Sequence, residues 1–251
     1  MRKIIYTPTG RAGEYGKYAV NLFEGCSHGC TYCYAAGMFC KAKDRPRKDF
    51  HASPTPKIDA LARLERDLHK LHGESVFMSF SCDPFPPEYE LREITLQAIG
   101  KILHYGNAVN ILTKGGMRAR ECFSTLTSTP FMKPLQNKLG ATLTFVTPSL
   151  SAKYEPFATL PDSRIEMLKT AHDMGIYTWA SIEPVLIPSE SLEIMRIAIP
   201  YVDEFKIGKL NHHPEAEKAI DWKKFAKEAV RLMEYSNKKY ILKADLKKYY
   251  E

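Results

Sequence analysis

The chain has 251 residues, of which 44% are hydrophobic and 26% are charged. This ordinary globular composition excludes collagen-like, coiled-coil and wholly disordered chains, and the length is enough for a full core in one large domain or two small ones. The 36 Lys and Arg residues exceed the 29 Asp and Glu residues, and the resulting net charge of +7 permits nucleic acid or another anion as a partner without establishing one.

No apolar run is long enough to span a membrane, and the first residues lack the apolar core of a signal peptide. We therefore expect a cytoplasmic protein without membrane association. No linker rich in Pro, Gly or Ser divides the chain, so the sequence predicts a single domain over residues 1–251. Its core covers about 17–212, and 213–251 supplies a C-terminal helix and a short capping segment.

Short β-branched or aromatic runs, each bounded by turn residues, predict six strands. They cover 18–23, 75–80, 108–112, 141–146, 177–182 and 204–207, with a candidate seventh strand over 240–243. Stretches with apolar residues three and four positions apart predict intervening helices over 57–71, 91–103, 163–174, 189–199 and 222–233. Asp162, Ser163 and Ser189 are expected to provide N-cap oxygens.

Alternating strands and helices predict an α/β fold with a parallel sheet and right-handed crossovers. Six such units fit a partial (β/α)6 TIM-like open barrel, whereas a closed eight-unit barrel would be tight in this length. The site of such a fold lies at the carboxyl ends of the strands. Polar or ionisable residues follow the predicted strands there, among them Ser79, Ser81, Cys82, Asp83, Lys114, Ser149, Glu183, Lys209, Asn211 and His212.

Three of the six cysteines fall within eight residues, directly after the first predicted strand. Cys26, Cys30 and Cys33 have the spacing Cys-x3-Cys-x2-Cys, and in a cytosolic protein such bunching favours metal binding or catalysis over disulfides. Three thiolates on a tight loop can hold three irons of a [4Fe–4S] cluster, leaving the fourth iron for another ligand. The alternative is a zinc site that recruits Cys40 or His28 as its fourth ligand.

The motif, with Tyr32 directly before the third cysteine, resembles the signature of the radical S-adenosylmethionine (radical SAM) enzymes. The wider sequence over 6–10 and 21–35 is similar to the branch that includes spore photoproduct lyase. The resemblance implies that the amino and carboxylate groups of S-adenosylmethionine chelate the fourth iron. One electron from the reduced cluster then cleaves the sulfonium, and the resulting 5′-deoxyadenosyl radical abstracts hydrogen from a substrate. It also implies an electron donor such as flavodoxin or ferredoxin.

The same resemblance assigns roles to the polar residues after the strands. Ser79, Ser81 and Asp83 occupy the place that binds the cofactor's amino group, although the commoner Gly-Gly-Glu sequence is absent and Asp83-Pro84 could equally form a turn. The remaining expected partners are Tyr32 near the adenine, Lys114 for the carboxylate, Ser149 and Glu183 for the ribose, and Lys209, Asn211 and His212 for adenine or substrate. A solvated role for Lys114 is equally consistent with the sequence.

Cys82 follows the second predicted strand, where spore photoproduct lyase has a cysteine that returns hydrogen to a product radical. Cys82 is therefore a candidate hydrogen donor, with Tyr34 as a further relay candidate; the alternative is a small packing residue. The leading function is a radical SAM enzyme acting on a nucleic-acid base or lesion, with a peptide or small metabolite as the alternative substrate. An alternative of another class is a non-catalytic zinc or iron–sulfur nucleic-acid-binding module.

Overall fold

The computed structural model describes residues 3–128, 135–211 and 214–251. Its main sheet has the order β1-β2-β5-β6-β7-β8-β9-β10, in which β1 is antiparallel to β2 and every later pairing is parallel. These strands are β1 (Ile5–Tyr6), β2 (Tyr18–Val20), β5 (Ser75–Met78), β6 (Ala108–Thr113), β7 (Lys138–Thr142), β8 (Tyr177–Ile182), β9 (Glu204–Ile207) and β10 (Lys239–Leu242). Within the described ranges the edge strands β1 and β10 do not pair, so the predicted open, parallel α/β sheet is confirmed, together with the candidate seventh parallel strand.

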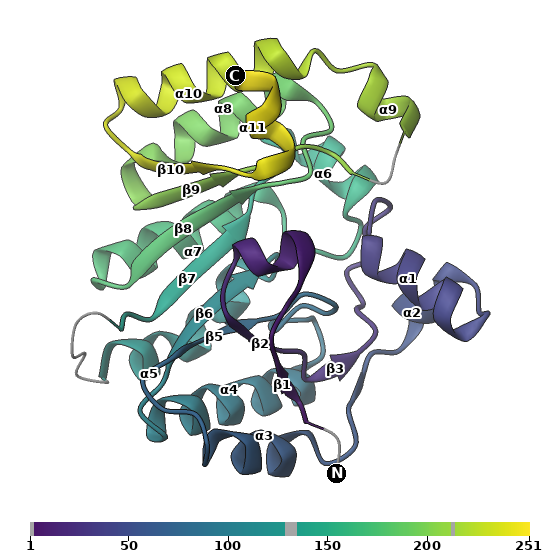
Figure 1. Ribbon diagram of the computed structural model, residues 1–251, viewed down its shortest axis with the longest axis vertical. Coiled ribbons are helices and arrows are strands. Elements are labelled where there is room, and N and C mark those ends of the chain that lie inside the picture. Colours follow the sequence, from purple (N-terminus) through teal and green to yellow (C-terminus); the bar gives the residue numbers. More distant parts are fainter. Residues whose placement is uncertain (1–2, 129–134, 212–213) are drawn as a thin grey trace.

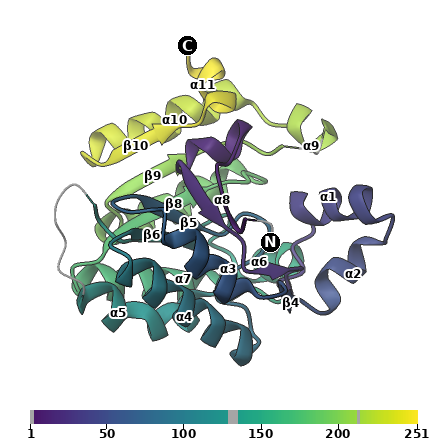
Figure 2. The same cartoon turned by 60° about the horizontal axis from the view of Figure 1, so that its bottom comes forward.

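Helices connect the parallel strands. They are α1 (Tyr34–Lys43), α2 (Arg47–Ala52), α3 (Ala60–Leu68), α4 (Tyr89–His104), α5 (Phe123–Ser128), α6 (Pro148–Tyr154), α7 (Pro161–Asp173), α8 (Pro188–Ala198), α9 (Pro214–Lys218), α10 (Trp222–Tyr235) and α11 (Ala244–Tyr250), with short 3₁₀ helices η1 (Gly10–Glu14), η2 (Gly116–Cys122) and η3 (Ile199–Tyr201). Helices α4, α5 and α7 cover one face of the sheet, α10 and α11 lie along the β10 edge, and α1 and α2 stand apart from the helical layer (Figures 1 and 2). The two ends of the chain lie at opposite ends of the molecule (Figure 1).

Two predicted strands differ from the observed elements by more than small shifts of their ends. The first divides, because β2 ends at Val20 and β3 (Phe23–Glu24) pairs with β4 (Thr55–Pro56) in a separate ribbon. The fourth begins three residues before its predicted start, at Lys138, and contains Gly140. Gly140 lies opposite Trp179, and a Cβ there would collide with the indole ring. Strand β7 therefore requires glycine at position 140. Glycine is uncommon inside strands and common in turns, so the sequence pattern missed the first half of this strand.

The expected N-caps of α7 and α8 are wrong. Leu160 and Ile187 occupy the N-cap positions, neither side chain caps its helix, and a proline stands in the first turn of each. Proline has no N–H to leave unsatisfied and its φ is already helical, so it starts these helices without a side-chain cap.

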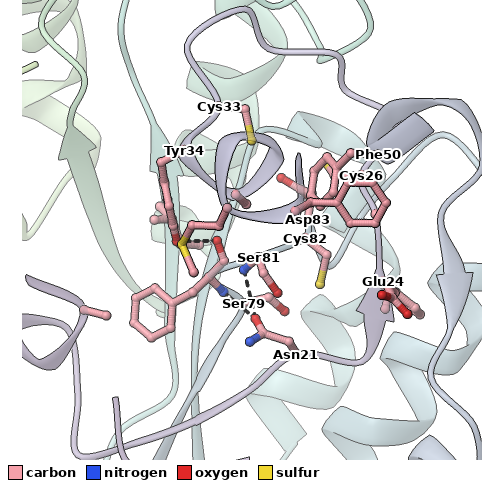
Figure 3. A pocket seen from close by; sticks show the side chains of 18 of the residues that line it. Asn21, Glu24, Cys26, Cys33, Tyr34, Phe50, Ser79, Ser81, Cys82 and Asp83 are labelled. Carbon is pink, nitrogen blue, oxygen red and sulfur yellow. Dashed lines mark hydrogen bonds between the residues drawn. The ribbon is translucent and has the colours of Figure 1, made fainter. Parts of the chain in front are cut away.

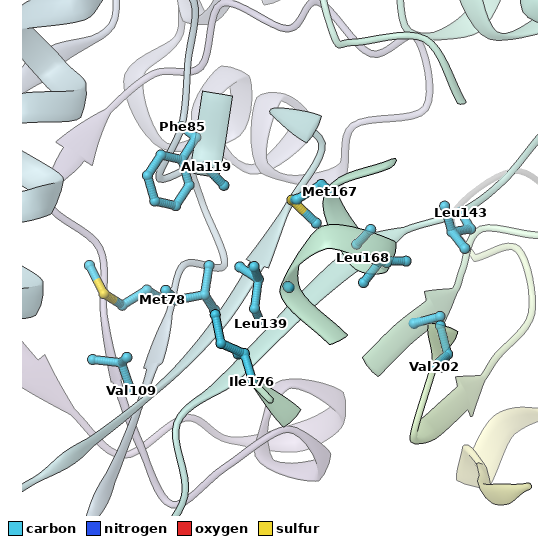
Figure 4. Close-up of a cluster of buried hydrophobic side chains, with 14 of the residues drawn as sticks. Met78, Phe85, Val109, Ala119, Leu139, Leu143, Met167, Leu168, Ile176 and Val202 are labelled. Atoms are coloured by element: carbon cyan, nitrogen blue, oxygen red, sulfur yellow. The ribbon is translucent and has the colours of Figure 1, made fainter. Parts of the chain in front are cut away.

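Side chains that alternate along the strands fill two separate layers. On β5, Val76 and Met78 pack in the large core between sheet and helices, part of which Figure 4 shows. Phe77 points to the opposite face and packs with Trp179, and both rings contact Tyr15 from the segment after η1. The N-terminal segment thus fills part of the inner face, and the open space that remains lies at the carboxyl ends of the strands.

Candidate functional site

A cavity of about 1550 Å³ lies at the carboxyl ends of the parallel strands (Figure 3). It brings together nearly all of the predicted site residues: Cys26, Cys30, Tyr32, Cys33, Tyr34, Ser79, Ser81, Cys82, Asp83, Lys114, Glu183, Lys209 and Asn211. Ser149 is exposed on α6 and is not among the lining residues. His212 lies outside the described residues.

The cysteine loop runs from the end of β3 to the start of α1. Gly25 has φ +91°, and a Cβ there would lie 2.8 Å from the carbonyl oxygen of Phe50. The Cys26 N–H donates to that same carbonyl at 3.0 Å, and the Cys33 N–H donates to the carbonyl of Cys30 at 3.1 Å. Only glycine combines a positive φ with such a close approach to another backbone atom, so the path of the chain into the cysteine loop requires Gly25.

The three thiols of the loop are free, and all three residues line the same cavity. Burial raises the pKa of Cys30 to about 12, and burial raises that of Cys26 well above its usual range. The negative charge of Asp83 raises the pKa of Cys26 further. A metal–sulfur centre would stabilise the thiolates, so the donor chemistry of this loop fits such a centre.

The alternative zinc site would take His28 or Cys40 as its fourth ligand. In the described part of the chain, no group of three or more Cys, His, Asp and Glu side chains is arranged to hold a single metal ion. His28, one proposed fourth ligand, is buried and has other partners: its Nδ1 lies 3.4 Å from Asp83 Oδ2 and its Nε2 lies 3.3 Å from Arg118 Nη1. Burial lowers its pKa to about 4, so the imidazole is neutral at pH 7.

Asp83 links the cysteine loop to the ends of β5 and β6. Its Oδ1 accepts hydrogen bonds from the Phe85 N–H at 2.9 Å and the Thr113 hydroxyl at 2.6 Å. Its Oδ2 accepts from the Lys114 N–H at 2.7 Å and faces His28. Burial alone would raise the carboxyl pKa, but His28 and these donors outweigh it and lower the pKa. These partners make Asp83 a positioning residue of the loop.

Asp83→Ala is expected to lower the free energy of unfolding by about 3 kcal/mol, because it leaves buried donors without an acceptor. The stabilisation by Asp83 is complete above its unfolded-state pKa and is lost as pH falls through the lower folded-state pKa. Denaturant unfolding at pH 7 and at acidic pH measures both effects. The exposed Asp173→Ala is the matched control. Equal stabilities of the two variants at pH 7 would contradict this role.

A buried ionic network supports the other side of the loop. The Tyr32 hydroxyl donates to Glu155, whose carboxylate pairs with Arg164 at 2.6 Å, and both partners of this pair are buried. Lys114 Nζ lies 5.7 Å from the centroid of the Tyr32 ring. Burial alone would lower the pKa of Lys114, but Cys30 in its thiolate form and the Glu155 carboxylate raise it. The network therefore positions a cation beside the cysteine loop.

A second network surrounds Glu183 at the end of β8. Its carboxylate accepts hydrogen bonds from Lys243, from the Tyr15 hydroxyl at 3.0 Å and from the Asn211 amide at 3.2 Å. The Asn211 amide also donates to Asp245 at 2.7 Å, whereas Lys209 pairs with Glu217 at 2.6 Å.

The sequence analysis missed several residues of these networks: Tyr15, Glu155, Arg164, Lys243 and Asp245. Lys243 could have been found, because it follows the seventh strand as the other rim residues follow theirs. No sequence signal identifies the others, because their roles come from contacts between distant segments. Tyr15 and Glu183, for example, are 168 positions apart.

Asn21 positions the backbone of the segment after β5. Its Oδ1 accepts the N–H groups of Phe80 at 2.7 Å and Ser81 at 3.0 Å, while the Tyr34 hydroxyl donates to the Phe80 carbonyl at 2.6 Å (Figure 3). The Cys82 thiol points away from Cys33 in this view. Burial raises its pKa, so Cys82 keeps its S–H hydrogen at neutral pH.

Within the described ranges, no helix has both the length and the apolar character to cross a bilayer.

An uncharacterized protein of Mycobacterium tuberculosis is 24% identical over 172 residues, covering 68% of this chain and 50% of that protein. An uncharacterized protein of Methanocaldococcus jannaschii is 26% identical over 170 residues, covering 68% and 61% of the respective chains. The chain thus spans about half the length of the mycobacterial relative.

Two solved structures share the fold. A spore photoproduct lyase variant with a dinucleoside spore photoproduct superposes with a TM-score of 0.57 at 12% identity, covering 82% of this chain and 60% of that chain. SuiB of Streptococcus suis bound to the precursor peptide SuiA has a TM-score of 0.50 at 12% identity, covering 74% and 42%.

A family model described as the Radical SAM superfamily matches residues 20–198. The match includes the three-cysteine loop and the strand ends from β5 to β8 that line the cavity. Because it covers well over half of the chain, this protein belongs to the radical SAM superfamily of enzymes.

Proposed function

We propose that Cys26, Cys30 and Cys33 hold a [4Fe–4S] cluster and that the adjoining cavity binds S-adenosylmethionine. The observation that carries this proposal is the convergence of three free thiols and the polar strand ends on one cavity of about 1550 Å³. When bound, the cluster supplies one electron that cleaves the sulfonium and yields a 5′-deoxyadenosyl radical for hydrogen abstraction. The chain's residues bind the cofactor and control access to it.

Side chains from successive strand ends would orient S-adenosylmethionine. Ser79, Ser81 and Asp83 are the proposed acceptors for its ammonium, and Asp83 would add this contact to the buried donors that it already accepts. Lys114, whose Nζ lies 5.7 Å from the centroid of the Tyr32 ring, would pair with the carboxylate. The remaining assignments are Tyr32 beside the adenine, Glu183 to the ribose hydroxyls, and Lys209 and Asn211 to adenine or substrate.

Anaerobic reconstitution with iron and sulfide tests this function. We expect about four irons and four sulfides per chain, and formation of 5′-deoxyadenosine and methionine when S-adenosylmethionine and dithionite are added. One zinc per chain without sulfide would instead assign the protein to the class of non-catalytic zinc modules. A cluster that leaves S-adenosylmethionine intact would reject the enzymatic proposal and favour an iron–sulfur binding module.

The proposed substrate is a nucleic-acid base or a lesion, which would make the protein a repair lyase or a base-modifying enzyme. Cationic residues outnumber acidic residues around the cavity: Lys3, Arg11, Lys43, Lys57, Arg63, Lys114, Lys209 and Lys243 against Glu24, Asp83 and Glu183. Such a lining attracts phosphates, and a base in a duplex would have to be flipped out. Transfer of deuterium from labelled oligonucleotides into 5′-deoxyadenosine tests this substrate class. Transfer only from a peptide or small metabolite would replace it.

Cys82 is the proposed hydrogen donor to the product radical, and Tyr34 is its candidate relay partner. Cys82→Ala should raise the ratio of 5′-deoxyadenosine to correct product above the wild-type ratio, because the product radical loses its donor. Chromatography of both products from labelled substrate measures the ratio, with the buried Cys122→Ala as the control. If Cys82 only packs, the ratio stays unchanged and the variant loses about 1 kcal/mol of stability.

We further propose that residues 1–251 act as one radical SAM unit in the cytoplasm. Its reductant would be a flavodoxin or ferredoxin, because cytoplasmic one-electron carriers of this kind reach the potentials that iron–sulfur clusters require.

A further inference from the structure

The cysteine loop separates the cavity from the protein surface, and its side chains alternate between the two. Along 26–32, the even-numbered residues line the cavity: Cys26, His28, Cys30 and Tyr32. The odd-numbered residues are not among the described residues that line it: Ser27, Gly29 and Thr31. Along this stretch the loop therefore turns one side toward the cavity and the other side away from it.

Phe157 lies against the outer side of the loop. A Cβ on Gly29 would be 3.0 Å from the Phe157 ring, and the Phe157 N–H donates to the His28 carbonyl at 3.2 Å. The Thr31 N–H donates to the Tyr154 carbonyl at 2.9 Å, so the segment after α6 follows the loop closely. Despite these contacts Phe157 is 64% exposed, which leaves a large apolar side chain on the surface next to the cysteine loop.

Three cationic side chains contact the cysteine loop or the segment after α6, or belong to α6 itself: Arg47, Arg118 and Lys153. Arg47 donates to the Thr31 carbonyl at 3.1 Å, and Arg118 donates to the Phe157 carbonyl at 3.5 Å. Lys153 is exposed on α6, next to the residue that accepts the Thr31 N–H. One carboxylate also contacts this side of the loop: Glu88 accepts a hydrogen bond from the Ser27 hydroxyl at 2.9 Å. The balance of charge on this face is therefore positive.

We propose that this outer loop face, formed by Phe157, Lys153, Arg47 and Arg118, is the docking surface for a small acidic electron carrier of the ferredoxin or flavodoxin type. The inference rests on the proposed function. The cofactor and substrate would occupy the cavity side of the loop, so the electron enters from the opposite side of the loop. The reduced carrier loses one electron and the cluster gains one, with no bond made or broken.

The physical properties of the face suit such a partner. Electron transfer slows steeply with distance, and Phe157 of this face lies against Gly29, the residue directly before Cys30. Cations steer an acidic protein to the face and favour fast association that weakens with salt. Transient redox complexes bury a small area, so one exposed aromatic ring with a cationic border is sufficient for docking. These properties indicate a brief, salt-sensitive complex.

The test compares two reductants on the reconstituted protein. In Lys153→Glu and Phe157→Ser, 5′-deoxyadenosine formation driven by an NADPH–flavodoxin reductase–flavodoxin system should fall about fivefold to tenfold at low salt. Formation driven by dithionite should stay at the wild-type rate, because a small reductant needs no docking surface. Higher ionic strength should slow the flavodoxin-driven reaction of the wild type more than that of Lys153→Glu.

Matched controls lie far from the loop on α10, where Lys227→Glu and Tyr235→Ser change an exposed cation and a 93% exposed aromatic ring. Flavodoxin-driven rates that are equal in all variants, or that fall equally in the control pair, would overturn the proposal. A change in sedimentation of Phe157→Ser would assign the face to a second copy of the chain and also overturn it. Absence of dithionite-driven cleavage in the wild type would instead reject the underlying function.

Discussion

Cys30→Ala is expected to remove most of the iron from the reconstituted protein and all cleavage of S-adenosylmethionine. The lost thiolate leaves one iron of the cluster without a protein ligand, and a cluster held by two cysteines is not retained. Cys26→Ala and Cys33→Ala should behave in the same way, since all three thiols line the cavity. Iron and sulfide analysis, the visible absorbance of the cluster and the yield of 5′-deoxyadenosine measure the effect.

Two cysteines outside the loop serve as controls for this result. Cys122 is buried in the core and its thiol donates to the Ala119 carbonyl at 3.0 Å, whereas Cys40 is half-buried on α1. Cys122→Ala and Cys40→Ala should keep both iron and cleavage. A full cluster in Cys30→Ala would contradict the ligand assignment, and loss of iron in Cys40→Ala would add Cys40 to the iron ligands.

Glu155→Ala is expected to have the largest effect on stability, about 3–5 kcal/mol. It leaves Arg164 as an uncompensated buried charge, and it removes the acceptor of the Tyr32 hydroxyl. Because Tyr32 lies within the cysteine loop, a loop that loses this support should also bind iron less completely. Urea unfolding of the apoprotein gives the free energy, and iron analysis after reconstitution reports on the loop.

The double variant Glu155→Leu/Arg164→Met separates the charge effect from packing. Replacing both ions by apolar groups removes the unpaired charge, so this variant should be more stable than Glu155→Ala. Glu166→Gln, exposed on the same helix as Arg164, should be nearly neutral. Equal losses in the single and double variants would show that the ion pair is not what stabilises this region.

The stabilisation by Glu155 also has a defined pH dependence. Burial alone would raise its pKa, but Arg164 and Lys114 outweigh burial and lower it. The stabilisation is therefore complete above the unfolded-state pKa, about 4.3, and is lost as pH falls through the lower folded-state pKa. The difference in stability between wild type and Glu155→Ala should accordingly shrink in acid.

The sequence by itself determined the α/β class, the order of the parallel strands and the membership in the radical SAM superfamily. These properties depend on local patterns: β-branched runs, helical spacing of apolar residues, and three cysteines within eight positions. Because parallel strands place their carboxyl ends at one edge, most of the site residues predicted from these patterns line the cavity.

Only the tertiary structure decided which polar groups already have partners. The sequence offers Asp83 as a cofactor acceptor, and folding in addition surrounds it with donors from the end of β6 and the cysteine loop. Tyr15 and Lys243 reach Glu183 from opposite ends of the chain, and Glu155 reaches Tyr32 across 123 positions. Such contacts depend on how distant segments pack, and no local pattern of residues encodes them, because burial and partner distance arise only when the sheet assembles.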